Sequence, residues 1–502
     1  MTGTIRPYAQ AHLGDVAGAV AARLKTLEQI GAVARMWQRD HTLWKPDPAE
    51  ITNRLDWLTL PETMAPAAPD LAAFGRRCEG FDRIVLMGMG GSSLAPEVLS
   101  LAGGKKPLLV LDSTHPQAVL AVERSGDLRR TLFIVASKSG ATVETHSQFR
   151  YFFQRAPRGD QFVAITDPGS PLETLAGDHG FLRTFLNPEG VGGRYSALSY
   201  FGLAPAAVMG IDAGMLLESG RQMAAACTAP GAGNPGLWLG AAIGEAALRG
   251  RDKLTLLPAS AEDGFGSWVE QLIAESTGKE GRGIIPVVEE STGRPGAYGA
   301  DRLFVAAGEA GALAPAVELP GRSLATLGGE FFRWEFATAV AGHILGINAF
   351  DQPNVEEAKA AARAVLAGGG AAAPTAGDLR STLSGVGPGA YLGILAYLPR
   401  TNEHHDRLQR VRLALRDRLR VATTLGFGPR YLHSTGQLHK GGPASGVFIQ
   451  VMDRPSEDAA IPGQSFTFRQ LLDAQADGDL AALRGRGRRA VRVSLEQLEQ
   501  EV

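Results

Sequence analysis

The segment RIVLMGMGGSS (83–93) decides the fold class of this 502-residue chain, because a short apolar run passes directly into a glycine-rich turn. Runs of the same kind follow at LLVLD (108–112), TLFIVA (131–136) and FVAIT (162–166), each stopping at Gly, Ser, Asp or Pro. Helical patterns lie between them. Apolar runs that alternate with helices are typical of a parallel sheet covered on both faces. We therefore predict an α/β domain over residues 61–215.

A second, weaker series of apolar runs predicts another α/β domain over residues 216–366. Its members are KLTLLP (253–258), GIIPVV (283–288), RLFVA (302–306) and PAVEL (315–319), again separated by helical patterns. Two tandem α/β units, each with a parallel sheet flanked by helices, follow from this arrangement.

The two ends of the chain differ from these units. Residues 1–60 lack apolar strand runs, so we expect a helical segment there. The small-residue stretch AGGGAAAPTAGD (367–378) is typical of a linker. Residues 379–502 predict an α/β addition, with a long helix near 403–425 and the strand GVFIQV (446–451).

The composition is that of an ordinary globular protein, with 44% hydrophobic and 20% charged residues. A net charge of -2 argues against a nucleic acid or a membrane surface as a partner. Cys78 and Cys227 are the only cysteines, which favours a reducing compartment. Because no apolar run is long enough to span a membrane and no signal peptide is recognisable, we expect a cytoplasmic location.

The turn GMGGSS (88–93) leaves two kinds of ligand open. Its glycines allow a ligand to approach the backbone, and the following helix offers free N–H groups to an anion. Gly88 and Gly90 also fit a dinucleotide fingerprint, and Asp112 ends the next strand where a ribose hydroxyl would lie. Ser93 replaces the third glycine of that fingerprint. A dehydrogenase therefore remains an alternative at this point.

The turn SKSGATVET (137–145) is more informative, because it crowds hydroxyl groups and one lysine between a strand and a helix. Such a turn can hold a phosphate dianion with its donors and with the helix dipole. The alternative is a capping-rich turn without a ligand, but one hydroxyl suffices for a cap. We therefore favour phosphate binding. The donors are Ser137, Lys138, Ser139, Thr142 and Thr145.

The chain resembles the phosphoglucose isomerases over residues 83–359, because five motifs occur in the order seen in that family. These are GMGGSSLAP (88–96), SKSGATVET (137–145), VGGRYSALS (191–199), EQLIAESTGK (270–279) and FDQPNVEEAK (350–359). The chain is especially similar to the isomerase half of fused transaldolase–phosphoglucose isomerases, whose openings resemble WQRDHTLWKPDPAEITNRL (37–55).

This resemblance implies a fold and an activity. The expected fold has two tandem sugar-isomerase (SIS) domains. The expected reaction is the reversible conversion of glucose 6-phosphate into fructose 6-phosphate, in glycolysis and gluconeogenesis, through an enediolate and without a cofactor or a metal ion.

The resemblance also assigns catalytic roles. Glu275 matches the base that moves a proton between C2 and C1, and Arg194 matches the arginine that faces the enediolate. Lys359 matches a lysine that helps to open the sugar ring. Taken alone, Glu275 would be read as an exposed glutamate paired with Lys279 at i+4, and Arg194 as a surface arginine. The motifs together favour the catalytic roles.

A second set of residues is expected to bind the substrate. Gln271 lies one helical turn before Glu275, where the family places a phosphate ligand. The full set is Gly91, Ser92, Ser137, Lys138, Ser139, Thr142, Glu144, Gln271 and Gln352.

The histidine that opens the ring in this family is missing from its usual segment, since residues 280–342 contain no histidine. His343 follows on an apolar helix and is better explained as a packed core residue. In LHSTGQLHKGGPASGVFIQV (432–451), however, His433 and Gln437 reproduce the family's His-x-x-x-Gln arrangement. We hypothesise that this segment was relocated in the sequence but fills the same place in space, where its imidazole shuttles a proton.

A metal site is a less favoured use of the histidines in this region. The ligands that it would need are His404, His405, His433 and His439.

The partners and the exact activity remain open at this stage. Family members are commonly dimers in which the histidine crosses from the neighbouring subunit, but the relocation could let one chain complete its own site. A homodimer and a functional link to transaldolase are both expectations. Alternative functions are a dual phosphoglucose/phosphomannose isomerase and a non-catalytic sugar-phosphate sensor.

Overall fold

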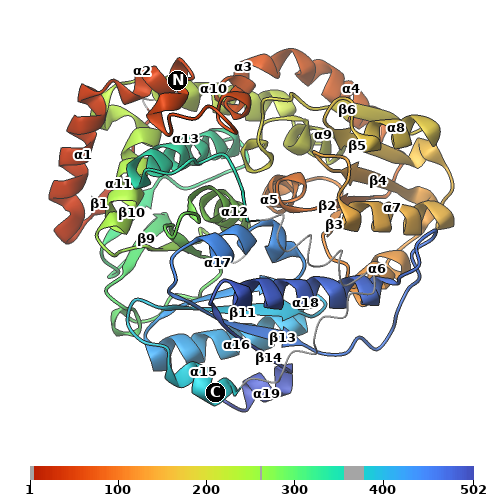
Figure 1. The fold of residues 1–502 in the computed structure, drawn as a ribbon. Coiled ribbons are helices and arrows are strands. Elements are labelled where there is room, and N and C mark those ends of the chain that lie inside the picture. Colours follow the sequence, from red (N-terminus) through yellow and green to blue (C-terminus); the bar gives the residue numbers. More distant parts are fainter. Residues whose placement is uncertain (1–4, 261–262, 355–377) are drawn as a thin grey trace.

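The computed structural model describes residues 5–260, 263–354 and 378–502, which form three β-sheets (Figure 1). The first sheet has the order β3-β2-β4-β5-β6, and all neighbouring strands are parallel. Its strands are β2 (Arg83–Gly88), β3 (Leu108–Leu111), β4 (Thr131–Ala136), β5 (Phe162–Thr166) and β6 (Arg183–Leu186). β2, β4 and β5 are buried along their whole length, which explains why they read as unbroken apolar runs.

Helices cover both faces of the first sheet, because successive side chains of each strand point to opposite sides. Ile84 and Leu86 pack against α4 (Ala68–Arg77), α5 (Leu94–Gly103) and α9 (Tyr200–Val208). Val85 and Met87 face the other side, in the cluster that includes residues of α6 (Pro116–Arg124), α7 (Val143–Arg155) and α8 (Pro171–Asp178).

The second sheet has the order β1-β10-β9-β7-β8. β7 (Lys253–Leu257), β8 (Ile285–Val287), β9 (Arg302–Ala307) and β10 (Ala316–Leu319) are parallel, whereas β1 (Gln10–His12) joins the edge antiparallel to β10. The expectation of an N-terminal segment without strands was therefore wrong at β1. Gln10 and His12 are exposed and the strand pairs through its backbone, so the sequence of β1 has no apolar pattern that would predict a strand.

The N-terminal segment is otherwise helical, and further helices pack around the second sheet. α13 contacts α10, α11 and α12. The bounds are α1 (Ala17–Gln29), α2 (Ala32–Trp37), α3 (Leu60–Thr63), α10 (Ala213–Ala226), α11 (Pro235–Leu248), α12 (Phe265–Thr277) and α13 (Leu327–Leu345).

The C-terminal region forms a third parallel sheet with the order β12-β11-β13-β14. The predicted helix near 403–425 was too long: it ends at Leu419, Arg420 adopts a left-handed conformation, and the β-branched run that follows forms β12. The elements are α15 (Leu379–Ser384), β11 (Tyr391–Tyr397), α16 (Asn402–Leu419), β12 (Ala422–Phe427), α17 (Gly436–Gly441), β13 (Gly446–Met452), α18 (Phe468–Gly485), β14 (Arg489–Val493) and α19 (Leu495–Glu499).

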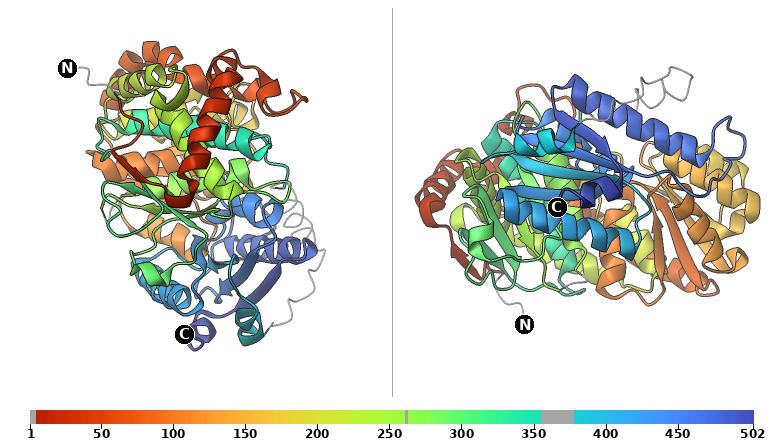
Figure 2. Two further views of the ribbon diagram at one scale, coloured as in Figure 1. Left: turned by 90° about the vertical axis from the view of Figure 1, so that its left-hand side faces the viewer. Right: turned by 90° about the horizontal axis from the view of Figure 1, so that it is seen from below.

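Helix α12 lies where the three sheet units meet, because it contacts α5, α13 and α17 (Figure 1). Figure 2 shows α18 extending from the third sheet towards the helices of the first unit. Phe468 and Leu471 at its start join the apolar cluster on the outer face of the first sheet.

Apart from β1, the strands of the three sheets fall within the predicted ranges 61–215, 216–366 and 379–502, and parallel sheets flanked by helices confirm the predicted fold class. The domain boundaries themselves stay predictions. Nearly all of the expected linker (367–378) lies outside the described residues. None of the helices in the described ranges combines the length and the apolar character needed to cross a membrane.

Candidate active site

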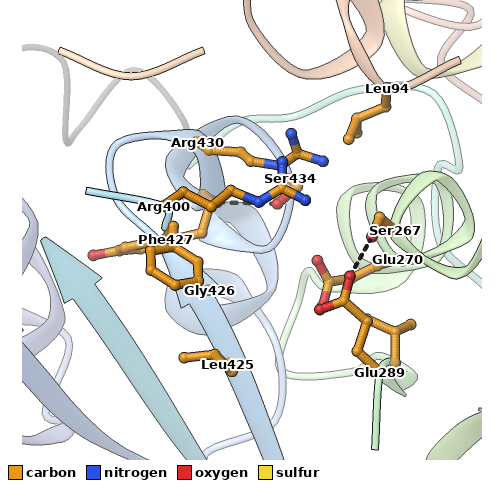
Figure 3. A pocket seen from close by; sticks show the side chains of 12 residues that line it. Leu94, Ser267, Glu270, Glu289, Arg400, Leu425, Gly426, Phe427, Arg430 and Ser434 are labelled. Atoms are coloured by element: carbon orange, nitrogen blue, oxygen red, sulfur yellow. Dashed lines mark hydrogen bonds between the residues drawn. The ribbon is translucent and has the colours of Figure 1, made fainter. Parts of the chain in front are cut away.

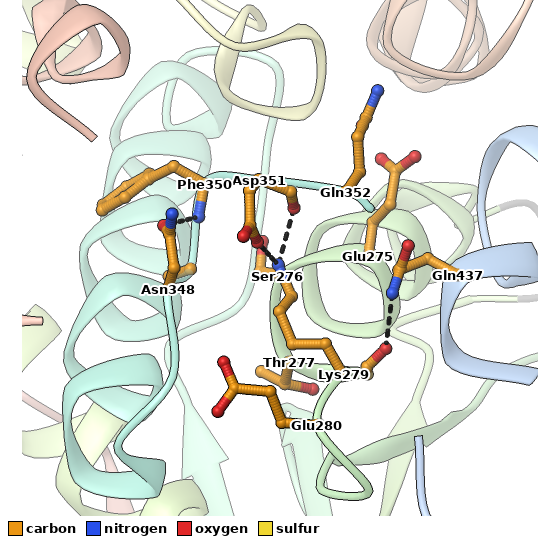
Figure 4. Close-up of polar contacts among 12 residues, drawn as sticks. Glu275, Ser276, Thr277, Lys279, Glu280, Asn348, Phe350, Asp351, Gln352 and Gln437 are labelled. Atoms are coloured by element: carbon orange, nitrogen blue, oxygen red, sulfur yellow. Dashed lines mark hydrogen bonds and ion pairs between the residues drawn. The ribbon is translucent and has the colours of Figure 1, made fainter. Parts of the chain in front are cut away.

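Glu275 lies near the C-terminal end of α12, at the centre of the molecule, with 4% of its surface exposed. Its Oε2 accepts a hydrogen bond of 3.1 Å from Gln271 Nε2 and lies 3.8 Å from an Arg194 guanidinium nitrogen. The alternative of an exposed glutamate paired with Lys279 is wrong. Lys279 is also buried, and its Nζ donates to the carbonyl and the carboxylate of Asp351, each at 2.6 Å (Figure 4).

Burial raises the pKa of Glu275, while the Arg194 charge, the Gln271 hydrogen bond and nearby His433 oppose that rise. A carboxylate whose pKa lies above that of a free glutamate holds an abstracted proton better. The arginine still favours the ionised form, which is the form that can act as a base. The surroundings of Glu275 therefore suit the transfer of a proton from carbon.

Arg194 is a buried arginine with 3% of its surface exposed, not the surface residue of the alternative interpretation. It lies in the 3-10 turn Gly193–Tyr195 (η9), and its Nε donates to Ser276 Oγ at 2.7 Å. One terminal nitrogen donates to the carbonyls of Ala349 and Asp351 at 2.8 and 2.9 Å, and the other donates to Gln352 Oε1 at 3.2 Å. These bonds fix a permanent positive charge beside Glu275.

The glycines of the 88–93 turn allow other backbone segments to approach, rather than a cofactor. A Cβ on Gly90, whose φ is +54°, would lie 2.5 Å from the His433 carbonyl oxygen and 2.7 Å from Gln271 Nε2. A Cβ on Gly91 would lie 2.0 Å from the Gly193 carbonyl oxygen. The turn therefore brings together the segments that carry Arg194, Gln271 and His433.

The predicted phosphate turn joins β4 to the start of α7, and no side chain caps the helix at Thr142. The Thr142 hydroxyl instead pairs with Ser137 Oγ at 2.8 Å. Ser139 is exposed, and the buried Thr145 hydroxyl has no hydrogen-bond partner among the described residues. In α8, by contrast, Ser170 caps its helix in the usual way. Uncapped N–H groups and an unpaired hydroxyl favour an anion site over a mere capping turn.

Lys138 forms an ion pair with Asp167, just after β5. Burial raises the pKa of Asp167, and the adjacent lysine works against that rise. The charge of Lys138 is thus already partly balanced, and its contact with a substrate phosphate stays a prediction. The attraction for an anion in this turn rests mainly on the hydroxyls and the helix N-terminus.

His433 ends the 3-10 turn Arg430–His433 (η12) of the third unit and lies beside α12 and α7. Its carbonyl oxygen accepts from Gln271 Nε2 at 2.9 Å, and its Nε2 lies 2.9 Å from Glu144 Oε1. Gln437 donates to the Gly278 carbonyl at 3.0 Å. The hypothesis of a segment relocated in sequence thus agrees with its position beside Glu275, within the same chain.

Arg430 anchors this segment to the first unit, because its guanidinium forms ion pairs with Glu97 and Asp112. Asp112, the residue expected to bind a ribose hydroxyl in the dinucleotide alternative, is therefore already paired with Arg430. Arg430 and Arg400 line a small cavity, and Glu270 lies among its other lining residues (Figure 3). The volume of this cavity is about 40 Å³. Burial and the charge of nearby Glu289 raise the pKa of Glu270 to about 8, but this carboxylate lies apart from the Glu275 site.

The histidines do not gather as the metal alternative requires. His405 pairs with Glu289, whereas His439 is buried against the rings of Tyr391 and Phe448. In the described ranges, no three His, Cys, Asp or Glu side chains are arranged as ligands of one metal ion.

The comparison with protein families agrees with this geometry. The phosphoglucose isomerase family matches residues 73–293, which include the phosphate turn, Arg194, Gln271 and Glu275. Residues 73–293 are therefore similar to the phosphoglucose isomerases.

Individual relatives of the phosphoglucose isomerase family match parts of the chain. A probable glucose-6-phosphate isomerase from Haloarcula marismortui is 35% identical over 213 residues, which are 41% of this chain and 49% of that protein. The glucose-6-phosphate isomerase of Thermosynechococcus vestitus is 33% identical over 352 residues, which cover 57% of this chain and 66% of that protein. The chain thus spans about half to two thirds of the length of these relatives.

A solved glucose-6-phosphate isomerase from Chlamydia trachomatis has the same fold, with a TM-score of 0.61 and 21% identity. The alignment covers 72% of this chain and 87% of that structure.

Two of the expected site residues are only partly defined by the structure. Gln352 is exposed and lies beside Arg194. Lys359 lies outside the described residues.

Other residues at the site were missed or assigned a different role from the sequence. Glu144, expected to bind substrate, is bonded to His433 here, and its predicted role stays untested. Asp351, which accepts from Lys279, and Gln475, whose Nε2 donates to Glu144 Oε1 at 2.7 Å, were not anticipated. Asp351 could have been found inside the FDQ motif, but nothing in the sequence near Gln475 signals a site.

Proposed function

We propose that the chain catalyses the reversible isomerisation of glucose 6-phosphate and fructose 6-phosphate. The observation that carries this proposal is the buried Glu275 carboxylate, which lies 3.8 Å from the Arg194 guanidinium and next to the His433 segment. A base, a fixed cation and an acid–base side chain are the groups that an aldose–ketose isomerisation needs.

In the isomerisation step, Glu275 removes the proton from C2 of the open-chain aldose. The C1 carbonyl oxygen gains negative charge as the enediolate forms. Glu275 then returns the proton to C1, while the proton of the C2 hydroxyl passes to O1 and the C2 carbonyl forms. Arg194 stabilises the enediolate, because its four hydrogen bonds and its ion pair with Glu275 hold its charge in place before the reaction begins.

The ring must open before this step. The C1 hydroxyl loses its proton, the C1–O5 bond breaks as the C1 carbonyl forms, and O5 receives a proton. We assign these two transfers to His433 and Lys359. Glu144, bonded to His433 Nε2 at 2.9 Å, stabilises the imidazolium that forms when His433 accepts a proton.

The substrate phosphate is assigned to the turn before α7. Ser137, Ser139, Thr142 and Thr145 supply hydroxyls there, and Lys138 adds charge at the edge. Gly91, Ser92, Gln271 and Gln352 complete the proposed pocket. Binding energy from the phosphate orients C1 and C2 against Glu275.

The test is a coupled assay of fructose 6-phosphate conversion by the wild-type chain and by Glu275→Gln. We expect wild-type activity and a loss of roughly 10³-fold or more in the variant, since a neutral amide cannot take the C2 proton. Glu270→Gln is the matched control, because it changes a carboxylate on the same helix that faces the separate cavity of Figure 3. Equal losses in both variants, or an inactive wild type, would refute the proposal.

A cytoplasmic location, a homodimer and a link to transaldolase also remain proposals. Activity on mannose 6-phosphate is the runner-up, and the same assay with that substrate decides it. His433 lies beside Gln271 and Glu144 of the same chain, which supports a site in which His433 and Glu275 act without a second subunit.

A further inference from the structure

A glutamine of the third unit lies directly behind the Glu144–His433 pair. Gln475 is on α18 and has 5% of its surface exposed. Its Nε2 donates to Glu144 Oε1 at 2.7 Å, which is the same oxygen that His433 Nε2 contacts at 2.9 Å. Its Oε1 accepts from the hydroxyl of buried Thr114 at 2.6 Å.

These contacts allow only one orientation of the Gln475 amide. An ionised carboxylate only accepts hydrogen bonds, so the amide must turn its N–H towards Glu144. A flipped amide would place two acceptor oxygens against each other. The Thr114 hydroxyl, which can donate or accept, donates to Oε1 in this orientation. Gln475 therefore presents a fixed donor to Glu144.

The fixed donor has a consequence for the imidazole of His433. With Gln475 on its Oε1, Glu144 acts as an acceptor, and His433 Nε2 must carry the proton that lies between them. In a neutral imidazole, Nδ1 is then the basic atom. Within the described ranges, His433 Nδ1 makes no hydrogen bond, so it is available for a ligand.

We propose that Gln475 is a positioning residue that holds Glu144 as an acceptor and thereby fixes His433 in the Nε2–H tautomer. This inference rests on the proposed function, in which His433 Nδ1 exchanges the proton needed for ring opening. Gln475 acts through Glu144 and does not touch the substrate.

The packing of α18 holds Gln475 in a fixed position. Leu471 packs on the first sheet, while Leu472 and Ala476 pack in the cluster beneath the His433 segment. The helix is thus held from both units that contribute to the Glu144–His433 pair. Residues 379–502 lie outside the part matched by the family, so no family motif points to Gln475.

The direct test is the tautomer of His433, read from ¹⁵N chemical shifts of histidine-labelled protein, with His433→Gln used to assign the signal. We expect the Nε2–H form in the wild type and a mixture of tautomers in Gln475→Met, which keeps the side-chain length but loses both hydrogen bonds. Thr114→Val should change the ratio in the same direction by less. Gln148→Met is the matched control, because Gln148 is equally buried but donates to the Ser113 carbonyl instead.

The kinetic readout separates positioning from general damage. For glucose 6-phosphate, kcat in Gln475→Met should fall roughly tenfold or more. This loss is a part of the roughly 10²- to 10⁴-fold rate acceleration that a positioned acid–base group contributes. A four-carbon aldose phosphate cannot close a ring, because its terminal oxygen is esterified, and its turnover should change less than about threefold.

Two results would overturn the inference: an Nδ1–H tautomer in the wild type, or an unchanged tautomer ratio in both Gln475→Met and Thr114→Val. If Gln475→Met fails to fold, Thr114→Val alone decides. An inactive wild-type chain would refute the proposed function, but the tautomer measurement would still decide the role of Gln475.

Discussion

Residues 73–293 and residues 379–502 contribute to the same site in different ways. The first region matches a known family and carries Arg194, Glu275 and the hydroxyl-rich turn. The second region lies outside that match, yet it places His433 within 2.9 Å of both Glu144 and Gln271. The difference teaches that the region recognised by its family does not contain all side chains of the proposed catalytic site.

The contacts between the two regions are specific, and this explains how an added unit can complete a site. Arg430 forms ion pairs with Glu97 and Asp112, and Gln437 bonds to the Gly278 carbonyl at the end of α12. A Cβ on Gly278 would lie 2.4 Å from Leu438 Cα, so the two backbones are in direct contact. Such close packing leaves little freedom for the position of His433.

After Glu275→Gln, the largest effect is expected in the family-matched region, from Arg194→Met. Loss of a preorganised cation should lower kcat by roughly 10²–10³-fold, as for other groups that stabilise an oxyanion. The acid limb of the pH–rate profile should also change. Glu275 acts only when ionised, so activity falls as the pH drops through its raised pKa; without Arg194 that pKa rises further, and the limb moves to higher pH. An acid limb at the same pH in Arg194→Met and in the wild type would show that Arg194 does not lower the pKa of Glu275.

The next effect tests the added region. His433→Leu should lower the turnover of glucose 6-phosphate roughly 10²-fold and that of the four-carbon aldose phosphate far less. Mixing this variant with Glu275→Gln should restore no activity, because both side chains act within one chain. Recovery of activity in the mixture would mean that the histidine is shared between subunits, and equal losses on both substrates would reject its ring-opening role.

A smaller effect should follow from Thr145→Val in the phosphate turn, a change that keeps the shape but removes an unpaired buried hydroxyl. If this hydroxyl binds the phosphate, KM should rise roughly five- to tenfold, which corresponds to about 1–1.4 kcal/mol, the net value of one ordinary hydrogen bond. Ser147→Ala, at another buried hydroxyl of the same helix, should leave KM unchanged. An unchanged KM in Thr145→Val would remove this residue from the phosphate site.

The smallest effect on activity is expected at Glu335, a buried carboxylate on α13 whose pKa is raised well above its usual value by burial. It stays protonated when folded but ionises when unfolded, so wild-type stability should fall as the pH rises above the ordinary glutamate value, by up to about 1.4 kcal/mol per pH unit. Glu335→Gln cannot ionise. Its stability advantage, measured by urea denaturation, should therefore grow between pH 6 and pH 8, with kcat changed less than about twofold. A constant difference would show that Glu335 is ionised in the folded chain.

Much of the fold and part of the site could be predicted from the sequence. The unbroken apolar runs of β2, β4 and β5 predicted a parallel sheet, because strands buried on both faces need apolar side chains throughout. β1 could not be predicted in this way, since it pairs through its backbone at an edge and exposes its side chains. The helix over 403–425 was extended too far, because the apolar residues of β12 follow α16 with only a short turn between them.

The sequence by itself determined which chemical groups are available. A hydroxyl-rich turn, a glutamate on a helix and an arginine after two glycines are local patterns, and each could be recognised from the sequence alone. Only the tertiary structure decided which of these groups meet. Burial turned Glu275 from a helix-surface glutamate into a carboxylate with a raised pKa, and packing brought His433 to Glu144 across 289 positions of the chain. Contacts of that kind depend on how whole units dock, and no short stretch of sequence encodes that docking.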